Sequence, residues 1–182
     1  PIAEEEILRY YDWVEERRRY VDSVSSGKIG YLHIPDMDTF GLVRFMKMFY
    51  HQIRKEGLII DVRYNGGGFV STLILQRLRQ ELRALGASRN FKEAPRGIYA
   101  HMITLTNEFS CSDGDYFPYF FREYKLGPLM GKRTWGGVVG IRGFPALLDG
   151  GYCTVPEFSI YDLKGNWIME NVGVVPDMEV EN

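Results

Sequence analysis

The amino-acid sequence predicts an α/β fold in which buried strands alternate with helices. Three segments are almost continuously apolar, which is typical of strands buried on both faces, as in a parallel sheet. These segments are residues 29–34, 58–63 and 98–107. Segments with helical spacing of apolar residues lie around and between them, at residues 3–24, 39–55, 70–85 and 113–124. Such alternation predicts parallel pairing of the strands through helical crossovers.

The expected helices carry recognisable start and end signals. The first helix begins with three glutamates (residues 4–6), which suit the positive end of a helix, and "SSGK" (residues 25–28) ends it. Gly57 ends the second helix and Gly86 the third, because glycine readily adopts the conformation that terminates a helix. After the fourth helix the glycine-rich residues 126–143 follow. Alternating, strand-like segments then lie at residues 152–162 and 167–180, around a turn at Lys164–Asn166.

Length and composition indicate one globular unit. The chain has 182 residues, 45% of them hydrophobic and 25% charged, which is typical of a single globular domain. With 22 basic and 24 acidic residues, the formal net charge of −2 gives no reason to expect nucleic acid or an anionic membrane as a partner. No apolar run reaches the roughly 18 residues of a membrane span. The chain starts at Pro1 without a methionine, and we interpret it as a piece of a longer protein.

The residue types that hold metals or disulfides are sparse. Cys111 and Cys153 form neither a CxxC nor a Cys/His zinc pattern, so each is expected to be a small buried hydrophobic residue. Two cysteines do not fix the redox compartment. Two acid pairs have short spacing, Asp36 with Asp38 and Asp113 with Asp115. Because neither pair has a third ligand at usable spacing, the sequence predicts no metal site.

The first candidate site is Asn65-Gly66-Gly67-Gly68, between an expected strand and an expected helix. Three consecutive glycines leave the backbone amides unscreened by side chains and permit positive φ angles. Their N–H groups can therefore point at one anion or carbonyl oxygen. A tight strand-to-helix turn explains the same residues without any function. Nucleotide binding is disfavoured, because the glycines form neither a GxGxxG pattern nor a Walker loop.

The second candidate site is "NEFSCSDGD" (residues 107–115), again between a strand and a helix. A nucleophile at Ser112 would feel the positive end of the helix, and the next amide could donate to an oxyanion. The alternative is an ordinary helix N-cap, which serine before Asp-Gly-Asp commonly provides. Ser110 is a competing cap or nucleophile. The pattern is not GxSxG, so an α/β-hydrolase elbow is not indicated.

The remaining candidates are one carboxylate and three histidines. Glu170 lies between apolar residues at an expected strand end, where it could orient a histidine or a hydroxyl, or simply face solvent. His33 and His101 lie in apolar strands and are expected to be core residues, whereas His51 on the second helix is expected at the surface. None of the three histidines has a sequence setting that marks a catalytic base.

Taken together, these segments resemble the tail-specific protease superfamily, peptidase family S41, and in particular its tricorn-like branch. Five segments in the right order carry the resemblance, which covers nearly the whole chain. They are "GYLHIPDM" (30–37), "DVRYNGGG" (61–68), "TNEFSCSDGD" (106–115), "GKRTWGG" (131–137) and "ENVGVVPD" (170–177). A single run of glycines would be weak evidence, but five ordered segments are a specific pattern.

The resemblance implies a Clp protease/crotonase-like α/β spiral. Residues 1–182 would form a single catalytic subdomain, the nucleophile-bearing half of a tricorn-like core. It implies that Ser112 is the nucleophile and that Glu170 is the charged residue at the far end of a serine–histidine relay. The backbone amide of Asp113 and one glycine amide from residues 66–68 would form the oxyanion hole.

The general base is the feature of the family that this chain lacks. One branch of the superfamily uses a Ser–Lys dyad, with the lysine in a "GKxTxGKG" segment. Here that segment reads "GKRTWGGV", so Gly137 stands at the lysine position, while Lys132 matches the earlier, structural lysine. The tricorn-like branch uses a histidine preceded by a serine, both from an earlier subdomain separated by a PDZ-like insertion. Nothing in this chain matches that subdomain, so the isolated chain is expected to be inactive.

The resemblance therefore implies a serine peptidase that hydrolyses peptides or unfolded chains through an acyl-enzyme. No cofactor is expected, since this acyl-transfer chemistry requires none. Its parent would supply the Ser-His pair from an upstream subdomain and would be a homo-oligomer. Two alternatives remain open. One is a crotonase-like acyl-CoA enzyme, whose paired amides would serve an enolate. The other is a catalytically incomplete module that binds peptides or supports assembly.

Overall fold

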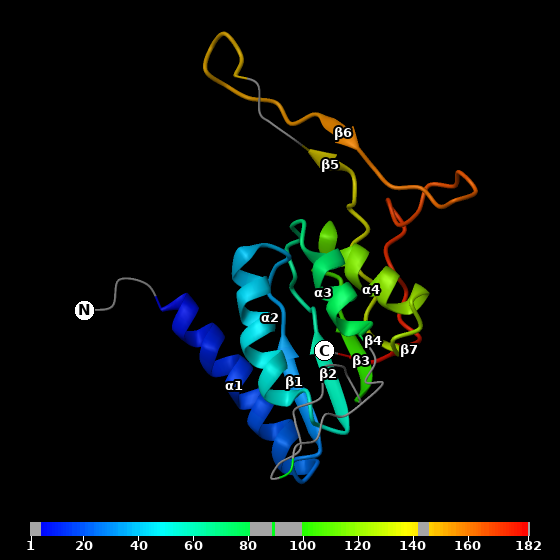
Figure 1. Ribbon diagram of the computed structural model, residues 1–182. Helices are drawn as coiled ribbons and strands as arrows, with labels where there is room; N and C mark the ends of the chain where they lie inside the picture. The colour runs from blue at the N-terminus through cyan, green and yellow to red at the C-terminus, as the bar shows by residue number, and fades with distance from the viewer. Residues whose placement is uncertain (1–4, 81–88, 90–99, 142–145, 182) are drawn as a thin grey trace.

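The computed structural model of the chain confirms the α/β expectation (Figure 1). It describes residues 5–80, 89, 100–141 and 146–181. The four helices in this part are α1 (Glu6–Val24), α2 (Thr39–Gln52), α3 (Ser71–Leu78) and α4 (Asp113–Glu123). The strands are β1 (Ile29–His33), β2 (Gly57–Asp61), β3 (His101–Thr106), β4 (Leu129–Gly131), β5 (Gly140–Ile141), β6 (Pro156–Phe158) and β7 (Met178–Glu179). None of these helices has the length and apolar character needed to cross a membrane.

Five strands form one sheet in the order β1-β2-β3-β4-β7, and every neighbouring pair is parallel. In the pairing of β2 with β3, Ile60 lies opposite Thr104. Because the strands run in the same direction, the segments that follow β2 and β3 leave the sheet at the same edge, which is where α/β folds place their ligand sites. The sheet therefore brings the two glycine- and serine-containing loops together.

The core that fixes this sheet edge is aromatic and aliphatic. Phe45 and Phe49, one turn apart on α2, are fully buried and stack with ring centroids 5.0 Å apart. Phe117 and Phe121 are likewise one turn apart on α4 and fully buried, with their rings tilted relative to each other. These rings pack into the same cluster as Ile60 of β2. Since the apolar stripes of both helices are committed to the core, the start of α4 is held in place.

Several expected boundaries differ in the structure. The helix expected over residues 39–55 ends at Gln52, whose side chain turns inward and bonds both the amide and the carbonyl of Tyr31, at 2.7 and 2.9 Å. The helix expected over residues 70–85 is described to Leu78, and its expected end at Gly86 lies outside the described residues. The expectation of buried cysteines is wrong, because Cys111 is half-buried and Cys153 exposed.

The C-terminal segments form less strand than their alternating pattern predicts. Of residues 167–180, only Met178–Glu179 joins the sheet, by pairing with β4. Val172 and Val175 are 62% and 57% exposed, so their apolar character buries little surface. Of residues 152–162, only β6 is a strand, and it pairs antiparallel with β5 in an arm that stands away from the sheet (Figure 1). An alternating pattern produces a strand only where a partner strand is available.

His33, at the end of β1, connects helix α1 to the sheet. Its Nε2 donates to the backbone carbonyl of Arg63 at 2.9 Å, so its Nδ1 accepts from the Tyr10 hydroxyl at 3.1 Å. The imidazole is 3% exposed and contacts the Trp13 ring edge-on. Burial lowers the pKa of His33, and the positive charge of Arg63 lowers it further, although Asp61 opposes the shift. The structure confirms the expectation of a satisfied core histidine.

This environment predicts that acid weakens the fold through His33. The unfolded chain binds a proton at the ordinary histidine pKa of about 6.5, whereas the folded chain resists it. The free energy of unfolding should therefore decrease as the pH falls below about 6.5, by at most about 1.4 kcal/mol per pH unit for this group. Urea unfolding of His33→Gln between pH 7.5 and 5 should show a flatter profile than the wild type. His51→Gln, at an exposed histidine of α2, is the matched control; identical profiles for His33→Gln and the wild type would contradict the prediction.

Candidate active site

Asn65 connects the loop after β2 to the loop that carries Ser112. It is fully buried, and its amide nitrogen donates to the carbonyl of Ile34 at 2.8 Å. Its side-chain oxygen accepts from the Gly67 amide at 2.9 Å, and its backbone carbonyl accepts from the Cys111 amide at 3.0 Å. Asn65 belongs to the first candidate segment, but its role as the link between the two loops was not predicted from the sequence. The one available signal was a polar residue directly before three glycines.

Two of the three glycines are required by close backbone contacts. Gly67 has a φ of +89°, and a Cβ there would lie 2.6 Å from the Cβ of Ser112. Gly68 has a φ of +143°, and a Cβ there would lie 2.1 Å from the carbonyl oxygen of Met37. A side chain at either position would need both a strained backbone and a displaced neighbour. The loop is thus a tight turn that is also pressed against Ser112.

Ser112 is half-buried and has a constrained backbone conformation. Its φ of 56° and ψ of −123° are unusual for a residue with a side chain, and such strain concentrates at functional sites. It occupies the N-cap position of α4 but makes no side-chain cap hydrogen bond, so the capping interpretation is wrong. Among the described residues its hydroxyl has no hydrogen-bond partner, whereas its amide donates to the carbonyl of Gly137 at 3.0 Å.

Ser110 is the opposite case. Its side chain is fully buried, and its hydroxyl donates to the carbonyl of Val62 at 2.7 Å. A hydroxyl held in the core by such a bond cannot reach a substrate. Ser110, the competing candidate, is therefore a structural serine, and of the two candidates Ser112 is the one that lines a pocket.

Two backbone amides beside Ser112 lack partners within the described part of the chain. One is the amide of Asp113, the first residue of α4, and the other is that of Gly68. In contrast, the Gly67 amide donates to Asn65, and the Gly66 amide makes a long contact of 3.4 Å with the carbonyl of Pro35. Gly68 and Asp113 both line the same pocket as Ser112. Unpaired N–H groups at the start of a helix are suited to bind a negatively charged oxygen.

The acidic side chains at the start of α4 have structural partners. The Asp113 carboxylate accepts from the amide of Ser71 at 2.9 Å and also from its hydroxyl, which joins α4 to α3. The Asp115 carboxylate accepts from the Gly136 amide at 2.9 Å. Burial raises the pKa of both carboxyls. In the described segments no three potential ligand side chains gather as a metal site would require.

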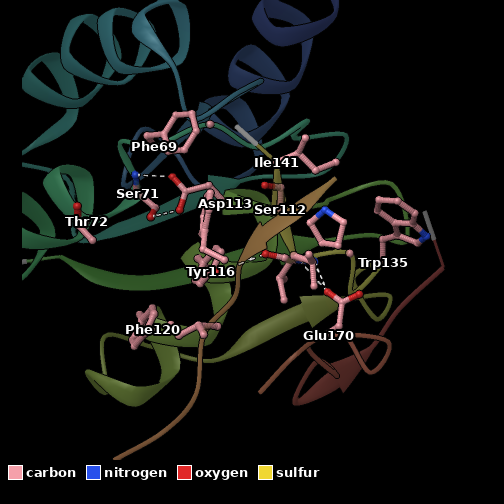
Figure 2. Close-up of a pocket in the computed structure, with 18 of the residues that line it drawn as sticks. Phe69, Ser71, Thr72, Ser112, Asp113, Tyr116, Phe120, Trp135, Ile141 and Glu170 are labelled. Carbon is pink, nitrogen blue, oxygen red and sulfur yellow. Dashed lines mark hydrogen bonds between the residues drawn. The ribbon is translucent and has the colours of Figure 1, made fainter. Parts of the chain in front are cut away.

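Glu170 lies in a turn, and the expectation of a strand end is wrong. Its Oε2 accepts from the amides of both Val138 and Val139, each at 2.8 Å. The residues on either side, Met169 and Asn171, have positive φ angles of 69° and 60°. The turn directs the Glu170 carboxylate to the wall of the pocket that Ser112 also lines, as Figure 2 shows.

The pocket itself is large and predominantly apolar, with a volume of about 780 Å³. Its apolar lining includes Phe69, Tyr116, Phe120, Val138, Phe158 and Ile160. Trp135 stands at its rim with 62% of its surface exposed (Figure 2). The two carboxylates in the lining, Asp113 and Glu170, are both already bonded within the chain. The site therefore combines a free hydroxyl, two free amides and an apolar cavity.

No histidine or lysine of the described residues lines this pocket. His33 is engaged with α1 as described above. His51 is exposed, as expected, but His101 is also exposed, so the expectation of a core position for it is wrong.

Lys132 forms ion pairs with the carboxylates of Glu179 and Glu181, at 3.2 and 2.6 Å, and so connects the end of β4 to the C-terminal segment. The described part of the chain thus offers no general base for Ser112.

Comparison with known proteins identifies the family. The model of peptidase family S41 matches residues 28–180. The tricorn protease of Thermoplasma acidophilum is 44% identical over 183 residues, and the tricorn protease homolog of Saccharolobus solfataricus is 43% identical. Each alignment covers 99% of this chain but only 17% of the relative, so the chain spans about a sixth of these proteins.

Solved structures agree with the sequence comparison. The crystal structure of the tricorn protease superposes with a TM-score of 0.94 at 43% identity, over 99% of this chain and 18% of that one. The photosystem II D1 C-terminal processing protease shares the fold, with a TM-score of 0.63 at 20% identity over 84% of this chain and 42% of its own. The family model and the tricorn relatives together show that this chain belongs to peptidase family S41.

Proposed function

We propose that this chain is the nucleophile-bearing part of a serine peptidase and that Ser112 is its nucleophile. The observation that carries the proposal is the constrained Ser112. Its hydroxyl, which has no partner within the described residues, lies in a pocket with the amides of Gly68 and Asp113, which are likewise unpaired there. This combination is what acyl transfer needs: an accessible oxygen and two donors aimed where negative charge develops. Membership of family S41 favours this activity over that of a crotonase-like acyl-CoA enzyme.

The proposed reaction is acyl transfer to water. A histidine from outside the described residues removes the Ser112 proton as the hydroxyl oxygen attacks the peptide carbonyl. The amides of Gly68 and Asp113 bind the resulting oxyanion. The histidine then protonates the leaving amine, which departs and leaves an acyl-enzyme, and water hydrolyses that ester by the same steps. Glu170 stabilises the positive charge of the histidine relay through the carboxylate oxygen that does not bind the pocket wall.

The base is proposed to come from an earlier part of a longer parent. Two observations support this: the described pocket contains no histidine or lysine, and the relatives are several times longer than the chain. A serine–histidine pair in an upstream subdomain of a homo-oligomeric parent would complete the site. The substrates would be peptides or unfolded chains, which can extend across the pocket.

The lining of the pocket predicts a preference for large apolar residues on the acyl side of the scissile bond. The described lining contains no basic side chain that could pair with an acidic substrate residue, and its two carboxylates, Asp113 and Glu170, accept hydrogen bonds from within the chain. Burying a leucine or phenylalanine side chain contributes about 1.5–3 kcal/mol, so kcat/KM should exceed that of the corresponding aspartate peptide by about 10- to 100-fold. A matched fluorogenic peptide series on the full-length parent measures this ratio. An equal or reversed ratio would contradict the apolar assignment.

Reaction with a fluorophosphonate tests the proposed function directly. The probe forms a covalent phosphonyl ester with an activated serine, and peptide mapping identifies the serine modified. We expect labelling at Ser112 in the full-length parent and none in its Ser112→Ala variant. The second candidate function, a peptide-binding module without catalysis, is favoured by the absence of a base from the described pocket. It predicts saturable peptide binding by the full-length parent, with neither labelling nor turnover.

A further inference from the structure

One backbone segment, residues 136–139, separates the nucleophile from Glu170 and forms a wall of the pocket. At its second residue, Gly137, the backbone carbonyl accepts from the Ser112 amide at 3.0 Å. One and two residues later, the amides of Val138 and Val139 donate to Glu170 at 2.8 Å. The wall is therefore bonded to the nucleophile at one end and to the glutamate at the other. Figure 2 shows the hydrogen bonds at the Glu170 end.

The turn that carries Glu170 is built to hold its carboxylate at this wall. Met169 and Asn171 both adopt positive φ angles, which side-chain-bearing residues accept only where the surroundings impose them. The Asn171 amide donates to the carbonyl of Gly136, and the Gly173 amide donates to that of Met169, each at 2.7 Å. A Cβ at Gly136 would lie 2.4 Å from the Gly173 nitrogen, so turn and wall are in direct backbone contact.

We propose that Glu170 is a positioning residue for substrate specificity: through Oε2 it fixes the Val138–Val139 backbone and so sets the shape of the apolar pocket beside Ser112. Both valines line the pocket, and Val138 is only 1% exposed, so a shift of their backbone would alter the cavity directly. This role rests on the proposed peptidase function but is separate from the charge that Glu170 supplies to the relay.

The two roles of Glu170 are chemically separable because the wall uses only one of its oxygens. Within the described residues, Oε1 has no hydrogen-bond partner. Glutamine at this position retains an oxygen that can accept both valine amides but removes the negative charge. Alanine removes both the acceptor and the charge. The difference between these two variants therefore isolates the contribution of the wall.

The experiment compares Glu170→Gln and Glu170→Ala in the full-length parent, with two peptides that differ only in phenylalanine or alanine on the acyl side. Glu123→Ala, at an exposed position of α4, is the control. For Glu170→Gln we expect kcat to fall by roughly 10²–10⁴-fold with KM within about twofold. For Glu170→Ala we expect the phenylalanine peptide to show, in addition, a KM raised by about tenfold, the equivalent of one or two lost hydrogen bonds. The alanine peptide should show little change in KM.

The outcomes distinguish this inference from the proposed function. Equal KM values for the Gln and Ala variants with the phenylalanine peptide would overturn the positioning role, whatever happens to kcat. An unchanged kcat in Glu170→Gln would instead remove Glu170 from the relay and leave the wall role standing. If Glu170→Ala does not fold, Glu170→Asp tests the positioning role instead. Its side chain is one methylene shorter, so its carboxylate cannot reach the amides of both Val138 and Val139. Its KM for the phenylalanine peptide should also increase, and an unchanged value would overturn the inference.

Discussion

Replacing Ser112 with alanine is expected to abolish peptide hydrolysis by the full-length parent, lowering kcat by roughly 10⁴- to 10⁶-fold. The fold should tolerate the change, because the hydroxyl makes no hydrogen bond among the described residues and alanine keeps the same Cβ at the same φ. We expect the free energy of unfolding to change by no more than about 0.5 kcal/mol. Turnover and thermal melting measured on one preparation test both halves of this prediction.

Ser110→Ala is the matched control, because it is expected to do the reverse. It removes the bond from a fully buried hydroxyl to the carbonyl of Val62 and leaves that carbonyl without its side-chain donor. Losing such a bond lowers the free energy of unfolding by about 1–3 kcal/mol. Peptide turnover at Ser112 should be largely retained. If Ser110→Ala eliminates turnover and Ser112→Ala does not, the nucleophile has been assigned to the wrong serine.

The second large expected effect is the loss of peptide hydrolysis when the chain is isolated from its parent. Residues 1–182 alone should hydrolyse peptides about 10⁴- to 10⁶-fold more slowly than the parent, because loss of a catalytic base typically costs that much. Adding the upstream region, on the same chain or as a separate polypeptide, should restore cleavage. The measurement is peptide turnover at equal concentrations of active serine, with Ser112→Ala as the background.

Robust hydrolysis by the isolated chain would contradict this prediction. It would direct attention to His33, His101 and Lys132 as candidate bases within the sequence. Each could then be replaced by glutamine or methionine in turn. The structure makes all three poor candidates, since His33 is buried against α1, His101 is exposed at the start of β3, and Lys132 is paired with two glutamates.

The parallel sheet was predictable because the sequences of two of its interior strands are largely apolar. Residues 58–63 and 98–107 are apolar runs, and the structure places Gly57–Asp61 and His101–Thr106 side by side at the centre of the sheet. The start of α4 at Asp113 was also predicted, from the Ser-Asp-Gly-Asp sequence. For these elements the local start signals and the apolar composition predict the same structure that the sheet and its core stabilise, so the sequence pattern alone is informative.

The details of the site depend on contacts between distant segments and were therefore less predictable. Glu170 was expected at a strand end because apolar residues alternate around it, but no neighbouring strand is available there and the chain turns instead. Asn65 bonds to residues 31 and 46 positions away. Ser110 differs from Ser112 because its hydroxyl faces the core. The hydrophobic pattern of the sequence does not predict which of two small residues so close in the chain points inward.

The position of Trp135 has a consequence for how the catalytic base could change during evolution. A Cβ at Gly137 would lie 2.4 Å from the Trp135 ring, so lysine at this position, where the Ser–Lys branch carries its base, requires the indole to move away. The effect of lysine at 137 therefore depends on the residue at 135. A smaller residue at 135 leaves room for lysine, whereas the exposed Trp135 ring first has to turn away. The two positions are thus epistatic, and replacing Trp135 before Gly137 is the less strained order of substitutions.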